Sequence, residues 1–387
     1  MALWSFRRLP QSRAGWNLLS FAERRISLLF LFLGLAVLTC GAELLVRGAS
    51  RLAVGMGITP LVVGLTVVAY GTSAPELVVS VQSALAGQSD LALGNVVGSN
   101  IFNVLFILGL SALIVPLKVD QKLIRFDVPL MIGLSGLVLA LGWNGRLGPL
   151  EGLVFLLGLL GYTAWAIIES RRESARVERE YAQEFGNSQA KPTWSANALQ
   201  AGLVLLGLVL LVLGARWFLF GAVEIARNLG VSELVIGLTI VAAGTSLPEV
   251  ATSIVAAIRG ERDIAVGNVV GSNIFNILGV LGLSALTAKD GIGVAATALA
   301  VDIPIMVGVA IACFPVFATG NVISRWNGAV FLGYYIAYTL AIVLSALQHR
   351  SGPTFNQVML WFVIPLTVLG IGTSWVRYLR AQKSAKS

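Results

Sequence analysis

The chain has 387 residues, of which 57% are hydrophobic and only 12% are charged, and its formal net charge is +8. A water-soluble domain carries roughly 25% charged residues, so this composition excludes an ordinary soluble domain. The basic residues lie mainly between long apolar runs, which favours a membrane protein with positive loops over a nucleic-acid-binding protein.

Eleven apolar segments follow a basic N-terminal tail, residues 1–25, that holds five arginines. The first apolar run is too long for the core of a signal peptide. About 20 apolar residues span a bilayer as a helix, and the backbone polar groups of a span must be paired internally. The sequence therefore predicts transmembrane helices at about 26–48, 58–87, 90–114, 127–143, 149–170, 199–226, 231–258, 263–287, 295–317, 326–347 and 354–376.

The longest polar stretch, Glu169–Lys191, divides the chain into five spans and six. We therefore expect a first five-helix repeat over 26–170, a cytoplasmic linker over 171–197 and a second five-helix repeat over 198–347. Residues 348–387 then supply one extra C-terminal transmembrane helix and a basic tail. The predicted fold class is an all-α polytopic membrane protein.

The two halves carry the same motifs at a constant spacing, which identifies an internal repeat. Shifted by 173 residues, Leu61–Leu113 falls on Leu234–Leu286 with about two-thirds of the positions identical. The ten residues GNVVGSNIFN occur unchanged at 94–103 and at 267–276. Each half holds five spans, an odd number, so the second half is expected to cross the membrane in the opposite sense. This is an inverted-topology repeat, a recurrent architecture of transporters.

Basic residues are distributed unequally over the two sides that this topology defines. With the N-terminus outside, the inner side collects seventeen: Arg47, Arg51, Lys118, Lys122, Arg125, Arg171, Arg172, Arg176, Arg179, Lys191, Arg259, Arg262, Arg325, Arg377, Arg380, Lys383 and Lys386. The outer loops collect four: Arg146, Arg227, Lys289 and Arg350. The count predicts a multi-pass protein of the plasma (inner) membrane with a cytoplasmic linker and C-terminus, although the five arginines of the tail point the other way.

Two glutamates, Glu76 and Glu249, lie at equivalent points inside the second and seventh predicted spans. Centring a charge in a bilayer costs at least about 2.5–3.5 kcal/mol, so such residues are usually functional. Each glutamate ends a Gly-Thr-Ser-x-Pro-Glu motif. Pro75 and Pro248 lack an N–H and clash with the carbonyl four residues earlier, so both helices should break at the membrane midplane. The structural alternative is a pair of carboxyls that only join helices.

The residues at the two breaks supply oxygen ligands. Thr72 and Glu76 are four apart and share a helix face, and Ser73 adds a second hydroxyl. The second half repeats this set as Thr245, Ser246 and Glu249. Hydroxyl, carbonyl and carboxylate oxygens are the ligands that hard cations prefer, Ca²⁺ above all.

The motif GNVVGSNIFN lies on the next span of each half and offers a partner helix to each break. Its glycines permit close helix approach or a further break. Asparagine carbonyls are good cation ligands, and the motif places them four residues after a serine, in the pairs Ser99 and Asn103, and Ser272 and Asn276. Packing through small residues and amide hydrogen bonds is the structural alternative, which best fits Asn95, Gly98, Asn268 and Gly271.

Four aspartates stand near the starts of predicted spans: Asp90, Asp127, Asp263 and Asp302. Two of them follow short polar links, and the other two precede a proline by two residues. For all four we expect a side chain that caps the helix N-terminus.

These motifs resemble the α-repeats of the sodium/calcium exchanger superfamily, the calcium:cation antiporters, over roughly residues 26–347. The likeness is greatest to compact prokaryotic members without a large regulatory loop. It implies ten core helices, of which the second, third, seventh and eighth are broken and form the site. Carried across by motif, it implies central ligands Glu76 and Glu249, flanking ligands Thr72, Ser73, Thr245 and Ser246, main-chain carbonyls of Ala69 and Ala242, and a cage completed by Ser99, Asn103, Ser272 and Asn276.

One departure from the family pattern lies in the second repeat, where some sodium/calcium exchangers carry an aspartate and this chain has Asn276. The site then holds two glutamates and two asparagines, so its maximum charge is −2 rather than −3. Two carboxylates balance one Ca²⁺ or two Na⁺, and the identity of the coupling ion, Na⁺ or H⁺, stays open.

The sequence therefore predicts a secondary active antiporter that exchanges Ca²⁺ for Na⁺ by alternating access, with no enzyme activity and no cofactor besides the transported ions. Its expected partners are inorganic cations and the lipid bilayer, not nucleic acid; protein partners stay unassigned. One alternative is Ca²⁺/H⁺ exchange, in which protonation of Glu76 and Glu249 replaces Na⁺. The others are a cation channel, an intramembrane enzyme and a membrane scaffold. A channel would conduct without a counter-ion. An enzyme would need a nucleophile–base pair, which this chain does not convincingly offer because its one histidine, His349, is peripheral. A scaffold would tolerate Glu76→Gln.

Overall fold

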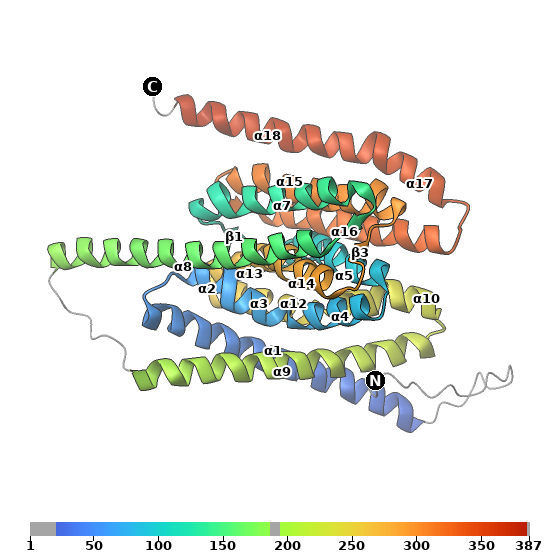
Figure 1. The fold of residues 1–387 in the computed structure, drawn as a ribbon, viewed down its shortest axis with the longest axis horizontal. Coiled ribbons are helices and arrows are strands. Elements are labelled where there is room, and N and C mark those ends of the chain that lie inside the picture. Colours follow the sequence, from blue (N-terminus) through green and yellow to red (C-terminus); the bar gives the residue numbers. More distant parts are fainter. Residues whose placement is uncertain (1–20, 186–193, 385–387) are drawn as a thin grey trace.

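The computed structural model describes residues 21–185 and 194–384, which are almost entirely helical (Figure 1). The first half contains α1 (Phe21–Met56), α2 (Pro60–Val63), α3 (Ala69–Thr72), α4 (Ala74–Leu85), α5 (Ser89–Phe102), α6 (Gly109–Ile114), α7 (Val128–Leu141) and α8 (Pro149–Phe185). The second contains α9 (Trp194–Asn228), α10 (Glu233–Ile236), α11 (Ala242–Gly244), α12 (Leu247–Arg259), α13 (Arg262–Phe275), α14 (Gly282–Thr287), α15 (Ile303–Ala318) and α16 (Arg325–Ala346). Two further helices, α17 (Gly352–Val358) and α18 (Ile364–Ser384), follow.

Within these ranges nine helices are long and apolar enough to cross a membrane, and two bent pairs raise the number to the eleven predicted. The bent pairs are Pro60–Thr72 with Ala74–Leu85, at 48°, and Glu233–Gly244 with Leu247–Arg259, at 50°. Both bends fall where Pro75 or Pro248 enters the first turn of the following helix, because proline has no N–H to continue the preceding one. The breaks predicted at these motifs are confirmed.

The third and eighth spans are not broken, contrary to the expectation drawn from the resemblance. Each is one unbroken helix, over Ser89–Ile114 and Arg262–Thr287, and widens into a π-helical segment near its centre. These segments are Asn103–Leu108 and Asn276–Leu281. GNVVGSNIFN contains no proline, so the backbone accommodates the irregularity as a π turn, a feature common at functional sites.

The sequence predicted that the four aspartates cap their helices, and the structure shows that this prediction is wrong. Helices α5 and α13 begin one residue earlier than Asp90 and Asp263, so both carboxyls lie in the first turn and make no cap hydrogen bond. Asp127 lies inside a helix that is continuous from Leu123 through its proline, because a π segment precedes Pro129. The buried Asp127 carboxylate instead accepts a 3.0 Å hydrogen bond from the Tyr162 hydroxyl. The carboxyl of its equivalent, Asp302, lies near the Tyr338 hydroxyl.

The described helices lie side by side in layers (Figure 1). Helices α4, α5, α12 and α13 form the centre, and α13 is almost completely buried. The pair α1 and α9 lies along one edge, and α17 and α18 lie along the opposite edge. Four two-residue strands pair loops of opposite halves, β1 (Leu117–Lys118) with β4 (Val322–Ile323) and β2 (Arg146–Leu147) with β3 (Ile292–Gly293), both antiparallel.

The ends of the predicted domains are only partly visible. Helix α8 continues through Phe185, and α9 begins at Trp194, so both enter the segment predicted as a linker. The remainder of that linker and most of the arginine-rich N-terminal tail lie outside the described residues.

Helices α1 and α9 pack backbone to backbone. Glycines recur every seven residues on the facing sides, at Gly34, Gly41, Gly48 and Gly55 of α1 and at Gly207, Gly214 and Gly221 of α9. A Cβ atom on Gly41 would lie 2.8 Å from Leu211 N and 2.9 Å from Gly207 O. Small residues let membrane helices approach closely and gain van der Waals contact. We therefore treat α1 and α9 as one packed unit.

Replacing Gly41 by leucine is expected to separate this pair and lower the thermal midpoint of the purified protein in detergent. Overpacking of this kind typically costs about 1–3 kcal/mol. Gly202→Ala on α9 is the matched control, because a Cβ there would meet no described atom within 4 Å. Equal midpoints for Gly41→Leu and the wild type would show that the two helices do not depend on this contact.

Candidate functional site

The two glutamates lie at the centre of the molecule, each in the first turn of the helix that follows a break. Glu76 is the third residue of α4 and Glu249 is the third residue of α12, and each side chain is buried, with only 1% of the residue exposed. The positive end of a helix dipole stabilises a carboxylate at this position. Proline therefore has two consequences here, because it breaks the span and places the glutamate at a new helix N-terminus.

Each carboxylate accepts a hydrogen bond from the other half of the chain. Ser73 Oγ donates to Glu249 Oε1 at 2.8 Å, and Ser246 Oγ donates to Glu76 Oε1 at 2.7 Å. Ser246 Oγ also lies 3.4 Å from Ser99 Oγ on α5. The two breaks thus face each other, and these contacts bring Ser73, Glu76, Ser246 and Glu249 of the two motifs to one place.

Four buried oxygens at this centre, besides the Thr245 hydroxyl, are left without a hydrogen-bond partner in the described part of the chain: Glu76 Oε2, Glu249 Oε2, Asn103 Oδ1 and Asn276 Oδ1. All four are acceptors, and they form two pairs related by the shift of 173 residues. A buried acceptor without a partner is costly, most of all on a carboxylate. Within the same ranges no third acidic, histidine or cysteine side chain joins the two glutamates in a metal-binding group. The arrangement is suited to a hard cation held by two carboxylates and neutral oxygens.

Asparagine side chains of the two GNVVGSNIFN motifs form hydrogen bonds between the two halves of the chain. Asn103 Nδ2 donates to Asn273 Oδ1 at 3.0 Å, and Asn276 Nδ2 donates to Asn100 Oδ1 at 3.0 Å. Sequence reasoning selected Asn103 and Asn276 but missed Asn100 and Asn273. The only signal available for them was that they are amides within the same duplicated motif.

The remaining amides of the motif support the backbone near the breaks. Asn95 Nδ2 donates to the Glu76 carbonyl at 3.1 Å and to Ser80 Oγ at 2.8 Å. On the other side, the Thr72 hydroxyl donates to Asn268 Oδ1 at 3.1 Å. These contacts agree with the packing role favoured for Asn95 and Asn268.

The flanking positions are not equivalent in the two halves. The Ala69 carbonyl is buried and lies 3.5 Å from Ser272 Oγ, whereas Ala242 is exposed. Thr72 is 1% exposed, whereas Thr245 is half-buried. The structure therefore brings the predicted residues of the first break into the centre more completely than Ala242 and Thr245 of the second.

A similar asymmetry is seen in the glycines at which the segment before each break meets α13 or α5. In one arm, Pro60–Thr72 packs against α13, and a Cβ on Gly64 or Gly271 would lie 2.9 Å from Ile264 Cα or 2.6 Å from Leu65 Cα. In the equivalent arm, a Cβ on Gly237 or on Gly98 would meet no described atom within 4 Å. The close approach expected at the motif glycines is confirmed at Gly271 and absent at Gly98.

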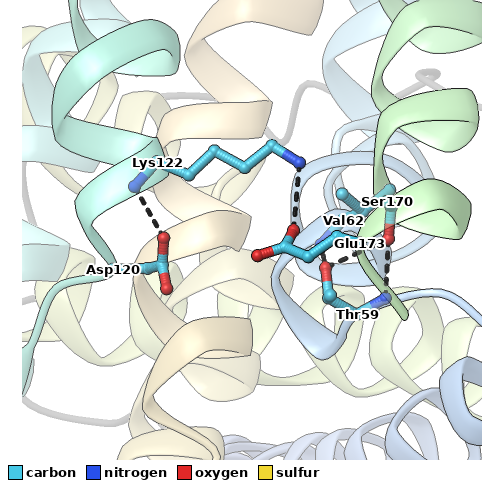
Figure 2. Close-up of polar contacts among 6 residues, drawn as sticks. All are labelled: Thr59, Val62, Asp120, Lys122, Ser170 and Glu173. Carbon is cyan, nitrogen blue, oxygen red and sulfur yellow. Dashed lines mark hydrogen bonds and ion pairs between the residues drawn. The ribbon is translucent and has the colours of Figure 1, made fainter. Parts of the chain in front are cut away.

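A polar contact links the start of the arm Pro60–Thr72, which we call the packed arm, to α8. Figure 2 shows Thr59, at the start of α2, beside Ser170 of α8, with Thr59 N donating to Ser170 Oγ at 2.7 Å. Lys122 reaches Glu173 of the same helix at 3.4 Å. At a shift of 176 residues, Ser170 corresponds to Ala346, which has no hydroxyl to offer. The hydrogen bond between Thr59 and Ser170 therefore has no equivalent in the other half.

An aromatic residue closes the packed arm nearer the site. Tyr70 stacks on Phe275 of α13, with ring centroids 4.5 Å apart, and its hydroxyl lies 2.7 Å from Thr163 Oγ1. The position equivalent to Tyr70 is Ala243. One arm is thus packed from its loop to the glutamates, and the other is not.

Comparisons with known proteins agree with this architecture. A family model described as "Sodium/calcium exchanger protein" matches residues 26–168 and 199–344. Inner membrane protein YrbG of Escherichia coli is 40% identical over 258 residues, which cover 66% of this chain and 78% of that protein. Sodium/calcium exchanger MaX1 of Methanosarcina acetivorans is 33% identical over 346 residues, 82% of this chain and 98% of that protein. A solved structure of the sodium-calcium exchanger NCX_Mj, soaked with 10 mM Na⁺ and zero Ca²⁺, aligns with a TM-score of 0.69 and 30% identity, over 83% of this chain and 99% of that chain.

Proposed function

Because this chain belongs to the sodium/calcium exchanger protein family, we propose that it is a secondary active antiporter that exchanges Ca²⁺ for Na⁺ across a membrane. The observation that carries the proposal is the pair of buried carboxylate oxygens, Glu76 Oε2 and Glu249 Oε2, that have no partner among the described residues. Asn103 and Asn276 add neutral oxygens, and Thr72, Ser73, Thr245, Ser246, Ser99, Ser272 and the carbonyls of Ala69 and Ala242 are the further candidate ligands.

Charge balance provides the coupling. Two carboxylates are neutralised by one Ca²⁺ or by two Na⁺, and each load displaces the other from the same oxygens. An empty site would expose two buried negative charges to a low-dielectric wall, so the protein does not change sides readily without a load. Exchange follows from this rule, with no covalent chemistry.

The asymmetry of the two arms supports alternating access. We assign the arm formed by Pro60–Thr72 and α13 as the closed gate, and the arm formed by Glu233–Gly244 and α5 as the open one. In the opposite state the roles of the two arms exchange, because the glycines that seal the first arm recur in the second. The packed pair of α1 and α9 is the candidate for the element that slides between the states.

Charged and polar residues link α1 to the turn between α12 and α13, beside the closed gate. Glu43 of α1 binds Arg47 on its own helix and accepts from Arg259 Nε, at the end of α12, at 2.8 Å. Ser50 of α1 donates to Glu261 at 2.8 Å. Movement of α1 and α9 along the core has to break both contacts.

The distribution of basic residues supports the orientation. With seventeen basic residues on one side and four on the other, we place the linker, the C-terminus and the closed gate in the cytoplasm and the open gate outside. The two halves, 26–170 and 198–347, then cross the plasma (inner) membrane in opposite senses, with the helix of 348–387 added.

Uptake of ⁴⁵Ca²⁺ into proteoliposomes tests the proposal. Liposomes holding purified protein are compared under an outward Na⁺ gradient, an outward H⁺ gradient and no gradient, with protein-free liposomes as the control. We expect uptake only with the Na⁺ gradient. Uptake driven by H⁺ alone would make the protein a Ca²⁺/H⁺ antiporter, gradient-independent uptake would make it a channel, and no uptake under any condition would contradict Ca²⁺ transport.

A further inference from the structure

The four asparagines of the two GNVVGSNIFN motifs that lie beyond the serines form one cluster, which we call the amide cluster. Its members are Asn100, Asn103, Asn273 and Asn276, and none is more than 3% exposed. Each half contributes two, and every side-chain bond within the cluster crosses between the halves. The cluster therefore lies where α5 and α13 meet, at the level where both helices widen into π segments.

Two members of the cluster have every polar atom engaged. Asn100 Nδ2 donates to the main-chain carbonyl of Asn273 at 3.3 Å, and Asn273 Nδ2 donates to the carbonyl of Asn100 at 3.3 Å. Their side-chain oxygens accept from Asn276 and Asn103. Met306 Sδ lies 3.7 Å from Asn100 Nδ2, and Met131 Sδ lies 3.4 Å from Asn273 Nδ2. Neither amide can turn over without giving up these bonds.

The other two members have only their nitrogens engaged. Asn103 and Asn276 each give an N–H to the cluster, and their oxygens are the buried acceptors without a partner among the described residues. An amide whose nitrogen is held on one side must present its oxygen on the other. The fixed pair thus determines which atom of the second pair is available to a ligand.

We propose that Asn100 and Asn273 are positioning residues that aim the carbonyl oxygens of Asn103 and Asn276 at the transported cation, and that Asn100 makes position 276 specific for an amide. This proposal rests on the cation site proposed above. A carboxylate at position 276 would place an oxygen against Asn100 Oδ1, in a contact that is now 3.0 Å long and attractive. Asn100 could donate to that carboxylate only by turning its own oxygen toward the Asn273 carbonyl.

The specificity for an amide limits the charge of the site. With Asn276 in place, Glu76 and Glu249 are the only carboxylates that the described residues place at the centre, so the load is one divalent ion or two monovalent ions. The amide cluster is therefore a determinant of stoichiometry as well as of affinity, although neither Asn100 nor Asn273 has an oxygen free for the ion.

A double-mutant cycle tests the proposal. Asn276→Asp, Asn100→Ala, Asn100→Ser and the two double variants are compared for the KM of Ca²⁺ in liposomes, for ⁴⁵Ca²⁺ binding in detergent and for thermal midpoint. We expect Asn276→Asp alone to raise KM at least about tenfold, the scale of leaving a buried hydrogen-bond acceptor unpaired. Either change at Asn100 should then lower KM again, because a carboxylate at 276 no longer meets an acceptor, and the serine hydroxyl can donate to it.

Each outcome of the cycle has a distinct meaning. Ser111→Ala, which removes a buried hydroxyl from the same span, is the control for loss of packing and should leave KM unchanged. If the KM of Asn276→Asp is the same with and without Asn100, or if Asn100→Ala changes only the thermal midpoint, the positioning role is wrong while wild-type exchange still stands. If the wild type itself neither binds nor transports Ca²⁺, the proposed function and this proposal both fail.

Discussion

Replacing Glu76 by glutamine is expected to abolish Ca²⁺ transport while the protein stays folded. Glutamine keeps the shape of the side chain and an oxygen that can accept from Ser246, so the 2.7 Å contact between the halves is retained. It removes one of the two charges that balance Ca²⁺. Truncating one partner of a buried charge pair costs about 2–5 kcal/mol, which corresponds to roughly 30- to 3,000-fold in affinity. Glu249→Gln is expected to have the same effect, because its bond from Ser73 is equivalent.

The measurement is Na⁺-driven ⁴⁵Ca²⁺ uptake together with the thermal midpoint of each variant. Glu151→Gln is the matched control, since Glu151 lies at the start of α8 and, among the described residues, bonds only the N–H of Gly148, three residues earlier. Uptake by Glu76→Gln at the rate of the wild type would show that the carboxylates only join helices. A loss of uptake with an unchanged midpoint separates the transport role from a structural one.

Alanine at two equivalent glycines is expected to shift the access equilibrium in opposite directions. A Cβ on Gly271 would lie 2.6 Å from Leu65 Cα, so Gly271→Ala should destabilise the closed gate seen here. At the equivalent Gly98 a Cβ meets no described atom within 4 Å, so Gly98→Ala should be silent in this state and disfavour the opposite one. Overpacking costs about 1–3 kcal/mol, which is a roughly 5- to 150-fold change in the ratio of the two states.

The populations can be measured by labelling the open arm. Ala242 is exposed in this state, so a membrane-impermeant maleimide should modify Ala242→Cys from outside in a variant that lacks Cys40 and Cys313. Labelling should slow when Gly271→Ala is added and should not slow with Gly98→Ala, although both slow exchange. Gly161→Ala on α8 is the control, because it has open space in the described structure. Equal labelling in all variants would contradict the assignment of the gates.

The features that the sequence predicted well are those with a local chemical cause. Pro75 and Pro248 lack a donor wherever the chain places them, so the breaks and the position of each glutamate follow from the motif. The third and eighth spans were expected to break by resemblance, and the motif's glycines only permitted such a break. These spans contain no proline at that point and instead form π segments.

Other features depend on how distant helices cross, and a local pattern carries no information on that. The sequence places Ser73 beside Glu76, whereas the structure pairs Ser73 with Glu249 of the other half. It shows Asn100 and Asn103 as two amides of one motif, but which atom each presents is decided by the helix from the other half. The capping role of Asp127 was wrong because Tyr162, from a later span, reaches the carboxylate.

The difference between the two gates could not be predicted from the motifs at all. GNVVGSNIFN is identical in both halves, yet Gly271 is sealed against Leu65 and Gly98 is open. Identical segments have identical local preferences, so the difference arises from the helices packed around them. Tyr70 and Ala243, which do differ, are the positions from which an inequality of the two gates could be suspected.

The exchange of hydroxyls between the halves has a consequence for biosynthesis. Ser246, which donates to Glu76, follows it by 170 residues. At about 5–20 residues per second, the ribosome needs roughly 10–30 s to make that stretch. Throughout this interval the inserted first half holds an acidic side chain within a broken span, without its serine. The newly made half-protein is therefore an incomplete bundle that depends on water, lipid headgroups or the insertion machinery until its second half arrives.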